Sequence, residues 1–284
     1  MSKSVVVGKY DKTAKVSQIA EILKQSENKI HLKGLIGSSL SFVVNSLFQK
    51  TELPFLMIFE DKEAAAYYLN DLEQLIGDKE VLFYPGSFRI PYQIEDVDNA
   101  NVLLRAEVLN RINSRKKPAI IVTYPESLFE KVVTKKELEK NTLKVAVGDK
   151  ISIDFINEVL FEYEFKRVDF ITEPGEFSVR GGIIDVFSFS NDNPYRIEFF
   201  GNEVDSIRSF DVETQLSIEK KNKITIIPNV ENKFFQEDRE SFLDYIASNT
   251  TLFIQNTEGL ISKLDTLFAK AEEAYNKLKG EIKH

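Results

Sequence analysis

The sequence contains no cysteine and only two histidines among its 284 residues. The absence of cysteine excludes disulfide bonds, thiolate chemistry and cysteine-based zinc sites, and two histidines are too few for a histidine-rich metal centre. No apolar run approaches the ~18 residues that a membrane-spanning helix needs, and the first residues do not resemble a signal peptide. We therefore expect a cytoplasmic protein that does not contact membranes and holds neither a cofactor nor a metal ion.

Positive charge is also scarce, because 37 lysines and arginines face 45 acidic residues and give a formal net charge of −8. Duplex binding needs clustered basic residues that neutralise phosphates, so a broad DNA-binding surface is not expected. Apolar residues are plentiful: they make up 43% of the chain and include 22 phenylalanines. This composition can fill real cores, and the length suggests about two compact units. A protein is the more plausible partner.

From residue 16 to about residue 125, helical patterns alternate with short buried strands. The predicted helices are 16–24, 38–49, 62–76 and 97–113, and the predicted strands are 29–35, 54–59, 81–84 and 119–123. Strands separated by helices favour crossover connections and a mostly parallel sheet with helices on both faces. The sequence therefore predicts an α/β fold for this part.

The periodicity changes near residue 151. A predicted helix at 153–163 precedes strands with hairpin turns up to residue 210, and a strand at 251–255 and a helix at 260–279 follow later. Such a change of pattern indicates a domain boundary. We interpret 126–212 as an inserted α+β domain with an antiparallel sheet. Residues 1–125 and 213–284 would then form one non-contiguous α/β domain.

Strand-like alternation is clearest at 173–210, where Pro174-Gly175 and Gly201-Asn202 mark turns. The apolar positions expected to share the core face are Phe177, Val179, Ile183 and Phe187. The polar positions expected on the solvent face are Ser178, Arg180, Arg196 and Glu198. The side chain of Phe177 could be an exposed contact instead of a core residue.

The polar face is unusual because positive charge is rare around it. Residues 158–211 contain 12 acidic side chains and 5 basic ones. A surface with this much negative charge repels DNA. We therefore expect the arginines to contact a protein. Arginine next to an aromatic residue is a common composition of interface hot spots. The alternative is that Arg180, Arg196 and Glu198 form a surface ion-pair ladder that contributes little to stability.

The segment 34–41 lies where a phosphate-binding loop would connect a strand to a helix. The signature of such a loop is Gly-x-x-x-x-Gly-Lys-Ser/Thr, but here Leu40 takes the place of the lysine and Ser39 that of a glycine. Without the lysine no cation reaches the phosphates, so we expect no nucleotide binding. The degenerate loop consists of Gly34, Gly37, Ser38, Ser39, Leu40 and Ser41. It is either a plain turn with Ser38 or Ser39 as helix N-cap, or a weak anion site.

Two sequence elements carry a family resemblance: Gly-Glu-Phe-Ser-Val-Arg-Gly at 175–181 and Arg-Ile-Glu-Phe-Phe at 196–200. They resemble the UvrA-binding element of the transcription-repair coupling factors (Mfd family) and of their relative UvrB. The degenerate loop resembles the coupling factors in particular. So does the short distance from Tyr92 to the predicted helix, which leaves no room for the aromatic hairpin of UvrB. The resemblance covers roughly residues 25–255.

The resemblance implies the N-terminal UvrB-homology region of a coupling factor, with a P-loop or helicase-like sheet and an inserted UvrA-binding domain. Such a region is a non-catalytic adaptor that recruits UvrA to RNA polymerase stalled at DNA lesions. The polymerase and double-stranded DNA would be bound by later domains of the intact protein. The ATP-driven translocase of the intact protein would mask the UvrA-binding face. The alternative is a UvrB-like, nucleotide-dependent enzyme of DNA damage recognition.

The same resemblance implies a set of UvrA contacts. Arg180 and Arg196 would make the main contacts, Lys166 or Arg167 would add a basic contact, and Glu198 would orient Arg196. Phe177 completes the candidate set. No catalytic residue is expected in this chain.

Overall fold

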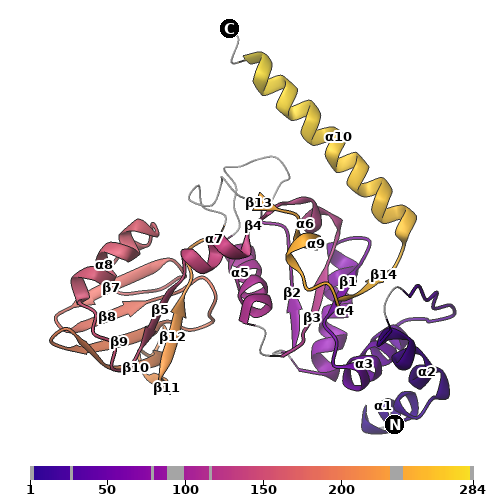
Figure 1. The fold of residues 1–284 in the computed structure, drawn as a ribbon, viewed down its shortest axis with the longest axis horizontal. Coiled ribbons are helices and arrows are strands. Elements are labelled where there is room, and N and C mark those ends of the chain that lie inside the picture. Colours follow the sequence, from indigo (N-terminus) through magenta and orange to yellow (C-terminus); the bar gives the residue numbers. More distant parts are fainter. Residues whose placement is uncertain are drawn as a thin grey trace. The chain divides into compact units, whose positions relative to one another are not determined.

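The computed structural model describes residues 3–25, 28–77, 80–87, 99–114, 117–230 and 239–281. The chain divides into two compact units (Figure 1). Unit 1 consists of Met1–Gly86, Ser114–Glu130 and Ile246–His284, and unit 2 of Ser87–Asn113 and Lys131–Tyr245. Among the described residues, no helix combines the length and the apolar character needed to cross a membrane.

Unit 1 contains a four-stranded parallel sheet in the order β14 (Thr251–Ile254), β1 (Phe55–Ile58), β3 (Ile120–Thr123) and β2 (Val81–Phe83). Every residue of β1 and β3 is buried, which is the pattern of strands covered on both faces. The predicted parallel α/β sheet is confirmed. The pairing of β14 with β1 returns the end of the chain to this sheet.

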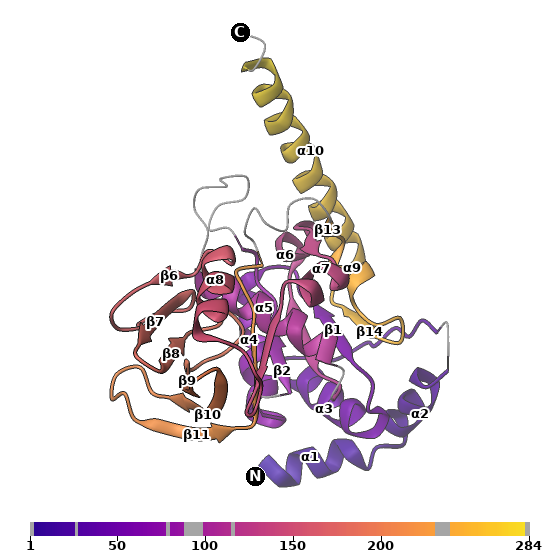
Figure 2. The ribbon, with the colours of Figure 1, turned by 60° about the vertical axis from the view of Figure 1, so that its left-hand side comes forward.

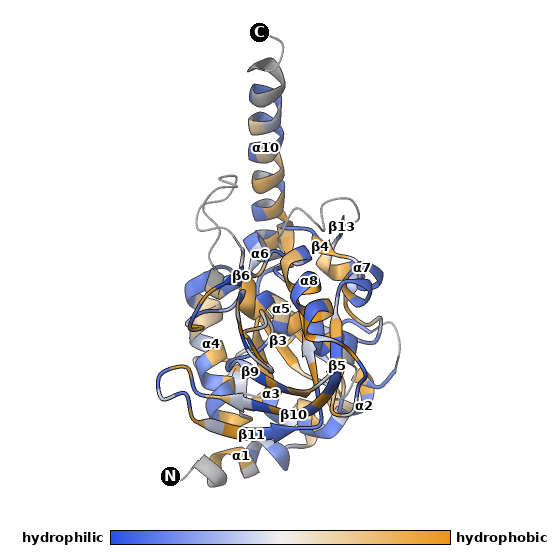
Figure 3. Ribbon diagram, turned by 90° about the vertical axis from the view of Figure 1, so that its left-hand side faces the viewer, coloured by the Kyte–Doolittle hydropathy of each residue, from blue (hydrophilic) through white to orange (hydrophobic). Residues whose placement is uncertain are grey.

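Helices of unit 1 supply the rest of its core. They are α1 (Lys3–Asp11), α2 (Ala14–Leu23), α3 (Ser39–Thr51), α4 (Lys62–Leu75), α6 (Pro125–Phe129) and α10 (Thr257–Glu281). Leu47 of α3 and Leu72 of α4 are fully buried and belong to one cluster with Phe55 and Val122. Along α10 hydrophobic and hydrophilic residues are interleaved (Figure 3), and its Lys263 forms an ion pair of 2.9 Å with Glu126 of α6.

The predicted strand at 29–35 is wrong, because this segment has no regular secondary structure. Lys29, His31 and Lys33 recur at every second position and are exposed. A strand inside this sheet is buried on both faces. It would therefore have to bury this row of polar side chains. Only the side chain of Leu32 packs against the core cluster.

Unit 2 is built on a six-stranded sheet (Figure 2). Its strands, in spatial order, are β11 (Ser217–Lys221), β10 (Glu203–Phe210), β9 (Tyr195–Phe200), β8 (Ile183–Val186), β7 (Glu176–Arg180) and β6 (Lys166–Arg167). All neighbours are antiparallel except β6 and β7. The predicted antiparallel sheet is therefore confirmed. The helices of unit 2 are α5 (Asn99–Ser114, up to Asn113), α7 (Lys135–Lys140), α8 (Ile153–Glu162) and α9 (Phe242–Tyr245).

One face of this sheet is covered by α8. The hydroxyl of Ser152 accepts a hydrogen bond of 3.1 Å from the amide of Phe155 and caps the helix. The ring of Phe161 makes an edge contact with Phe177, at 5.2 Å between centroids. Directly paired residues share a face, so the row Val179, Ile184, Ile197 and Ile207 lies on this side as well. The core of unit 2 therefore lies between α8 and this face.

The alternation of β8 differs from the expected one. Gly181, at a φ of +59°, and Gly182 form the turn between β7 and β8. This turn places Ile183 opposite Arg180, so Ile183 shares the polar face, and Ile184 takes the predicted core position. A one-residue change of register moves every side chain of a strand to the other face. This displacement brings Asp185 onto the polar face.

Two short ribbons complete unit 2: β12 (Lys223–Ile226) pairs with β5 (Leu143–Ala146), and β13 (Arg239–Glu240) with β4 (Val132–Val133). Because β11 extends the large sheet and β12 pairs with β5, the chain stays in unit 2 beyond residue 212, up to Tyr245. The compact units therefore have other bounds than the predicted domains. No strand of the parallel sheet comes from residues 126–212.

Candidate functional site

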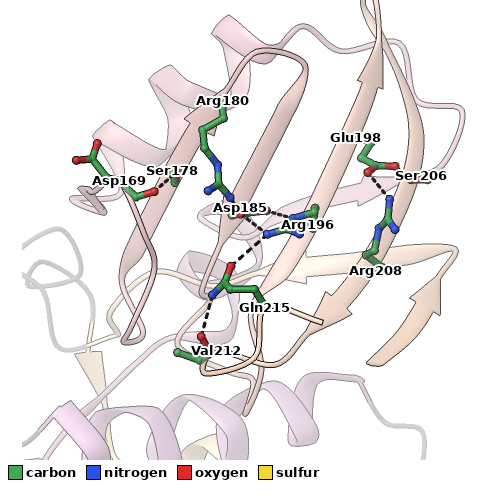
Figure 4. A network of polar contacts seen from close by, with 10 residues as sticks. All are labelled: Asp169, Ser178, Arg180, Asp185, Arg196, Glu198, Ser206, Arg208, Val212 and Gln215. Carbon is green, nitrogen blue, oxygen red and sulfur yellow. Dashed lines mark hydrogen bonds and ion pairs between the residues drawn. The ribbon is translucent and has the colours of Figure 1, made fainter. Parts of the chain in front are cut away.

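The polar face of the unit 2 sheet brings together three of the predicted contact residues, Arg180, Arg196 and Glu198 (Figure 4). One row of directly paired residues runs Ser178, Asp185, Arg196 and Arg208, and the next runs Arg180, Ile183, Glu198 and Ser206. Paired residues of neighbouring strands point to the same face. The structure therefore places Ser178, Arg180, Arg196 and Glu198 on one face, as the alternation predicts.

Asp185 is the centre of this face, and the sequence analysis did not identify it. Its side chain is only 2% exposed and forms ion pairs with both Arg180 and Arg196. The Nε of Arg196 donates to its Oδ1 at 2.7 Å, and the Nη2 of Arg196 donates to its Oδ2 at 2.8 Å. The signal for this residue was a single carboxylate in the apolar run Ile183–Val186. Buried carboxylates of this kind are normally paired.

Arg196 is mostly buried, which corrects the expectation that it faces solvent. Its side chain is 19% exposed, and its guanidinium lies 4.5 Å from the ring centroid of Phe210. Besides the paired bonds to Asp185, it donates a hydrogen bond of 3.3 Å to the side chain of Gln215. The bond to Asp185 raises the pKa of Arg196 above its ordinary value. Arg196 is therefore held by contacts within unit 2.

Glu198 has partners of its own on this face. It forms an ion pair with Arg208, and the hydroxyl of Ser206 donates to its Oε2 at 2.6 Å. The bond from Ser206, followed by that from Arg208, lowers the pKa of Glu198 below its ordinary value. Arg196 donates its hydrogen bonds to Asp185 and Gln215, whereas Glu198 interacts with Arg196 through charge.

Arg180 differs from Arg196 in its exposure. Its side chain is 42% exposed, and its guanidinium contacts Asp185 on one side. On another side the guanidinium carbon lies 5.5 Å from the ring centroid of Phe170, within the range of a cation–π contact. Phe170 is 67% exposed and was missed by the sequence analysis. An aromatic residue three positions beyond the end of β6 was its only signal.

The register of β6 distinguishes the two basic candidates. Lys166 lies opposite Glu176, and its Nζ is 4.0 Å from Glu176 Oε1. Arg167 lies opposite Phe177 instead. Glu176 and Arg180 share the polar face because they are separated by an even number of residues along β7. Lys166 therefore belongs to the face that carries Arg180, and its side chain is 74% exposed.

Phe177 lies in the core. It has no exposed surface and contacts Phe161 of α8. Of the two interpretations of this residue, the core one holds in this structure. Its ring is on the opposite face from Arg180, because neighbouring odd and even positions of a strand point to opposite sides.

The degenerate loop before α3 is a turn that leads into the helix. Gly34 and Gly37 have φ values of +80° and +54°, and Ser38 is the N-cap residue of α3. The amide of Ile36 donates to Ser39 Oγ at 2.7 Å, while Leu40 packs against the core of unit 1. Ser41 Oγ donates to Asp71 at 3.2 Å, which adds a carboxylate where a phosphate loop requires positive charge. Within the described ranges, no three His, Cys, Asp or Glu side chains are grouped so that they could hold a metal ion.

The polar face lies in a segment that a family model recognises. Residues 143–232 match the UvrB interaction domain. The match begins with β5 and includes β12, its partner strand, as well as all six strands of the large sheet. Unit 2 therefore carries a UvrB interaction domain, and this domain extends beyond residue 212.

Whole proteins of one kind match a larger part of the chain. This chain is 33% identical to the transcription-repair-coupling factor of Bacillus subtilis (strain 168) over 254 residues, which cover 89% of this chain and 20% of the relative. The factor of Myxococcus xanthus is 27% identical over 229 residues, which cover 78% of this chain and 19% of the relative. The factor of Escherichia coli (strain K12) is 25% identical over 206 residues, which cover 72% of this chain and 18% of the relative. The chain belongs to the transcription-repair-coupling factor family as its UvrB-homology region. It spans about a fifth of the length of these relatives.

Proposed function

We propose that this chain is a non-catalytic adaptor whose UvrB interaction domain binds UvrA and recruits it to RNA polymerase stalled at a DNA lesion. The observation that carries the proposal is the cationic polar face of unit 2. Lys166 and Arg180 are exposed there, in a domain where acidic residues outnumber basic ones. Isolated positive charge in an acidic surface favours a partner with complementary negative charge and disfavours nucleic acid.

The rest of the chain supports an adaptor more than an enzyme. The turn at 34–41 packs Leu40 against the core and places Asp71 beside Ser41, so it presents a carboxylate and no lysine where a nucleotide phosphate needs a cation. This observation weighs against the alternative of a UvrB-like, nucleotide-dependent enzyme. Unit 1 then acts as the scaffold that holds the UvrB interaction domain.

The intact protein would combine this adaptor with further activities. We propose that RNA polymerase binding, double-stranded DNA binding and ATP-driven translocation belong to other segments of the intact protein, since this chain covers about a fifth of the length of its relatives. We propose that the motor region masks the polar face of unit 2 until the polymerase is engaged. An open face would otherwise bind UvrA away from lesions. The setting of this activity is the bacterial cytoplasm.

Calorimetric titration of the purified chain with UvrA, without added nucleotide, tests the proposal. We expect saturable binding, and Lys166→Glu should weaken it, since reversal of an exposed charge at a complementary interface reduces affinity. Lys50→Glu is the matched control, because Lys50 is an exposed lysine at the end of α3 in unit 1. Absence of binding by the unmodified chain would refute the adaptor function.

A further inference from the structure

The long helix α10 of unit 1 exposes a row of large apolar side chains. Ile261, Phe268 and Tyr275 are 55%, 65% and 62% exposed on this 25-residue helix. They are spaced by seven residues, so they lie one above the other along one side of the helix. Single exposed apolar residues are ordinary, but a continuous row of them marks an interaction surface.

The exposed row is part of a heptad pattern. Leu264 and Ala271, both half-buried, lie three residues after Ile261 and Phe268 (Figure 3). Apolar residues therefore recur at alternating spacings of three and four residues from 261 to 275, which is the pattern of a helix that packs against a second helix. We call these five residues the α10 seam: Ile261, Leu264, Phe268, Ala271 and Tyr275.

Unit 1 covers a different side of α10. Leu267 is buried, and the Nζ of Lys263 lies 2.9 Å from a carboxylate oxygen of Glu126 in α6. Lys263 and Leu267 are four residues apart and therefore share one side of the helix. The exposed Phe268 is the next residue after Leu267 and points about 100° farther around the helix. Unit 1 thus packs beside the α10 seam and leaves its apolar row exposed.

An acidic row borders the α10 seam. Glu258, Asp265 and Glu272 are exposed and also spaced by seven residues. Each lies three residues before one of the exposed apolar residues, and so beside it on the helix surface. No lysine or arginine stands three or four residues from any of them, and none of the three forms an ion pair with another described residue. Glu273, in contrast, is paired with Lys277 at 2.7 Å.

We propose that the α10 seam is the docking site of a basic amphipathic helix from another segment of the intact protein. The docked helix places apolar side chains on the seam and lysine or arginine side chains opposite Glu258, Asp265 and Glu272. Opposite charges along the border of such a seam select the partner and its orientation. This docking site belongs to unit 1 and does not depend on the binding of UvrA.

The length of the α10 seam points to a partner on the same polypeptide. Coiled coils between separate chains repeat their pattern over about three to four heptads. The α10 seam spans only residues 261–275, which is about two heptads of seven residues. So short a seam binds weakly unless its partner is tethered, and a tethered segment has a high effective concentration. The match covers 20% of the Bacillus subtilis relative, so most of such a protein lies outside the matched part and can supply the helix.

A second copy of this chain fits the α10 seam poorly. In an antiparallel pair the two acidic rows would face each other, and like charges repel. In a parallel pair each acidic row would face Leu260 and Leu267 of the other copy, which lie on the side of the helix that unit 1 covers. A separate helix with basic residues avoids both conflicts.

Thiol labelling tests the docking, because this chain contains no cysteine of its own. Ala271→Cys places a thiol on the α10 seam and keeps the larger apolar side chains. Its reaction with a maleimide is followed by mass spectrometry of the α10 peptide, in the purified chain and in the intact protein. We define the protection as the rate in the purified chain divided by the rate in the intact protein. The protection should be about tenfold or more, since a docked seam reacts only when the partner helix leaves it.

A thiol on the other side of α10 is the control. Thr266 is exposed and lies two residues from both Leu264 and Phe268, about 200° around the helix from each. Thr266→Cys should therefore react at the same rate in the purified chain and in the intact protein.

Further substitutions in the Ala271→Cys background separate the apolar row from the acidic row. Phe268→Ala should bring the protection close to one, and it should keep the unfolding midpoint of the purified chain because this side chain is largely exposed. Glu272→Lys reverses a charge beside the seam and should lower the protection, as added NaCl should. Glu273→Lys is its matched control: it makes the same change about 100° farther around the helix and should leave the protection unchanged.

Several results would overturn the proposal. Equal labelling of Ala271→Cys in the purified chain and the intact protein would show that nothing docks on the seam. Equal protection of Thr266→Cys would show that the contact is not specific to this side of the helix. Protection that Glu272→Lys leaves unchanged would exclude a basic partner. Protection that grows with the concentration of the purified chain, or that appears on addition of UvrA or RNA polymerase, would assign the seam to a second copy or to that protein. None of these results bears on the titration with UvrA, so the adaptor function is tested separately.

Discussion

Arg196→Ala should destabilise unit 2 strongly, although arginines on strands are usually harmless to remove. The substitution leaves Asp185, which is 2% exposed, without the two hydrogen bonds that Arg196 donates to it. Removing one partner of a buried ion pair costs about 3–5 kcal/mol. Arg180 remains beside Asp185 and compensates in part, so we expect a loss of about 3 kcal/mol in the free energy of unfolding.

The measurement is urea unfolding followed by circular dichroism, together with hydrogen exchange of the amides in β8 and β9. A loss of this size corresponds to a fall of roughly 10 °C in the thermal midpoint. Arg180→Ala is the matched control: its side chain is 42% exposed, and Asp185 keeps its bonds to Arg196, so the loss should not exceed about 1 kcal/mol. The double variant Asp185→Leu/Arg196→Met should recover much of the stability, because it removes both charges together.

The result that would refute this reasoning is an Arg196→Ala variant with a free energy of unfolding within about 0.5 kcal/mol of the original chain. Arg196 would then be the surface residue that its sequence pattern suggests. A larger loss in Arg180→Ala than in Arg196→Ala would also contradict the assigned roles, because it would make Arg180 the main partner of Asp185.

Three further predictions concern other parts of the chain. Gly175→Ala should lower the free energy of unfolding, measured by calorimetry, by more than about 2 kcal/mol, because φ is +89° and the new Cβ would lie 2.6 Å from the ring of Phe189. Gly181→Ala is the control: φ is +59° and the space around it is open, so the loss should be only about 1 kcal/mol. The lowered pKa of Glu198 contributes stability that is present above the ordinary pKa of 4.5 and is lost as the pH falls through the lowered pKa. The urea midpoint of Glu198→Gln should therefore depend less on pH in that range than the urea midpoint of the original chain. Calorimetry with MgATP should show no binding, because Leu40 replaces the lysine of a phosphate loop; micromolar affinity would contradict this prediction.

Hydrophobic periodicity predicted most elements of the fold, because burial on one or both faces imposes it directly. The strands β1 and β3 read as continuous apolar runs, and both are fully buried in a parallel sheet. The strand expected at 29–35 fails for the same physical reason, since Lys29, His31 and Lys33 alternate where a doubly covered strand needs apolar residues. Periodicity does not show which neighbouring strand a strand pairs with. It was the pairing of β11 and β12 that extended unit 2 beyond residue 212.

Alternation also predicted which residues share the polar face, but not how they are paired. The turn at Gly181 and Gly182 determines the register of β8, and this register places Asp185 on the polar face. A sequence pattern that continues across such a turn cannot show whether the parity is kept or reversed. Asp185 was therefore missed, and with it the distinction between Arg180 and Arg196.

The register of the sheet explains why two arginines on one face have different roles. Asp185 is paired directly with Arg196 across β8 and β9, so the guanidinium of Arg196 meets the carboxylate edge to edge and donates two hydrogen bonds. Arg180 is paired with Ile183, one position away from Asp185 on that face, and reaches the carboxylate from the diagonal. The direct neighbour is buried by this geometry, whereas the diagonal one keeps an open edge beside Phe170. The ion pairs on this face therefore depend on strand register, because a one-residue shift of β8 would move Asp185 to the opposite face and leave both arginines without this carboxylate.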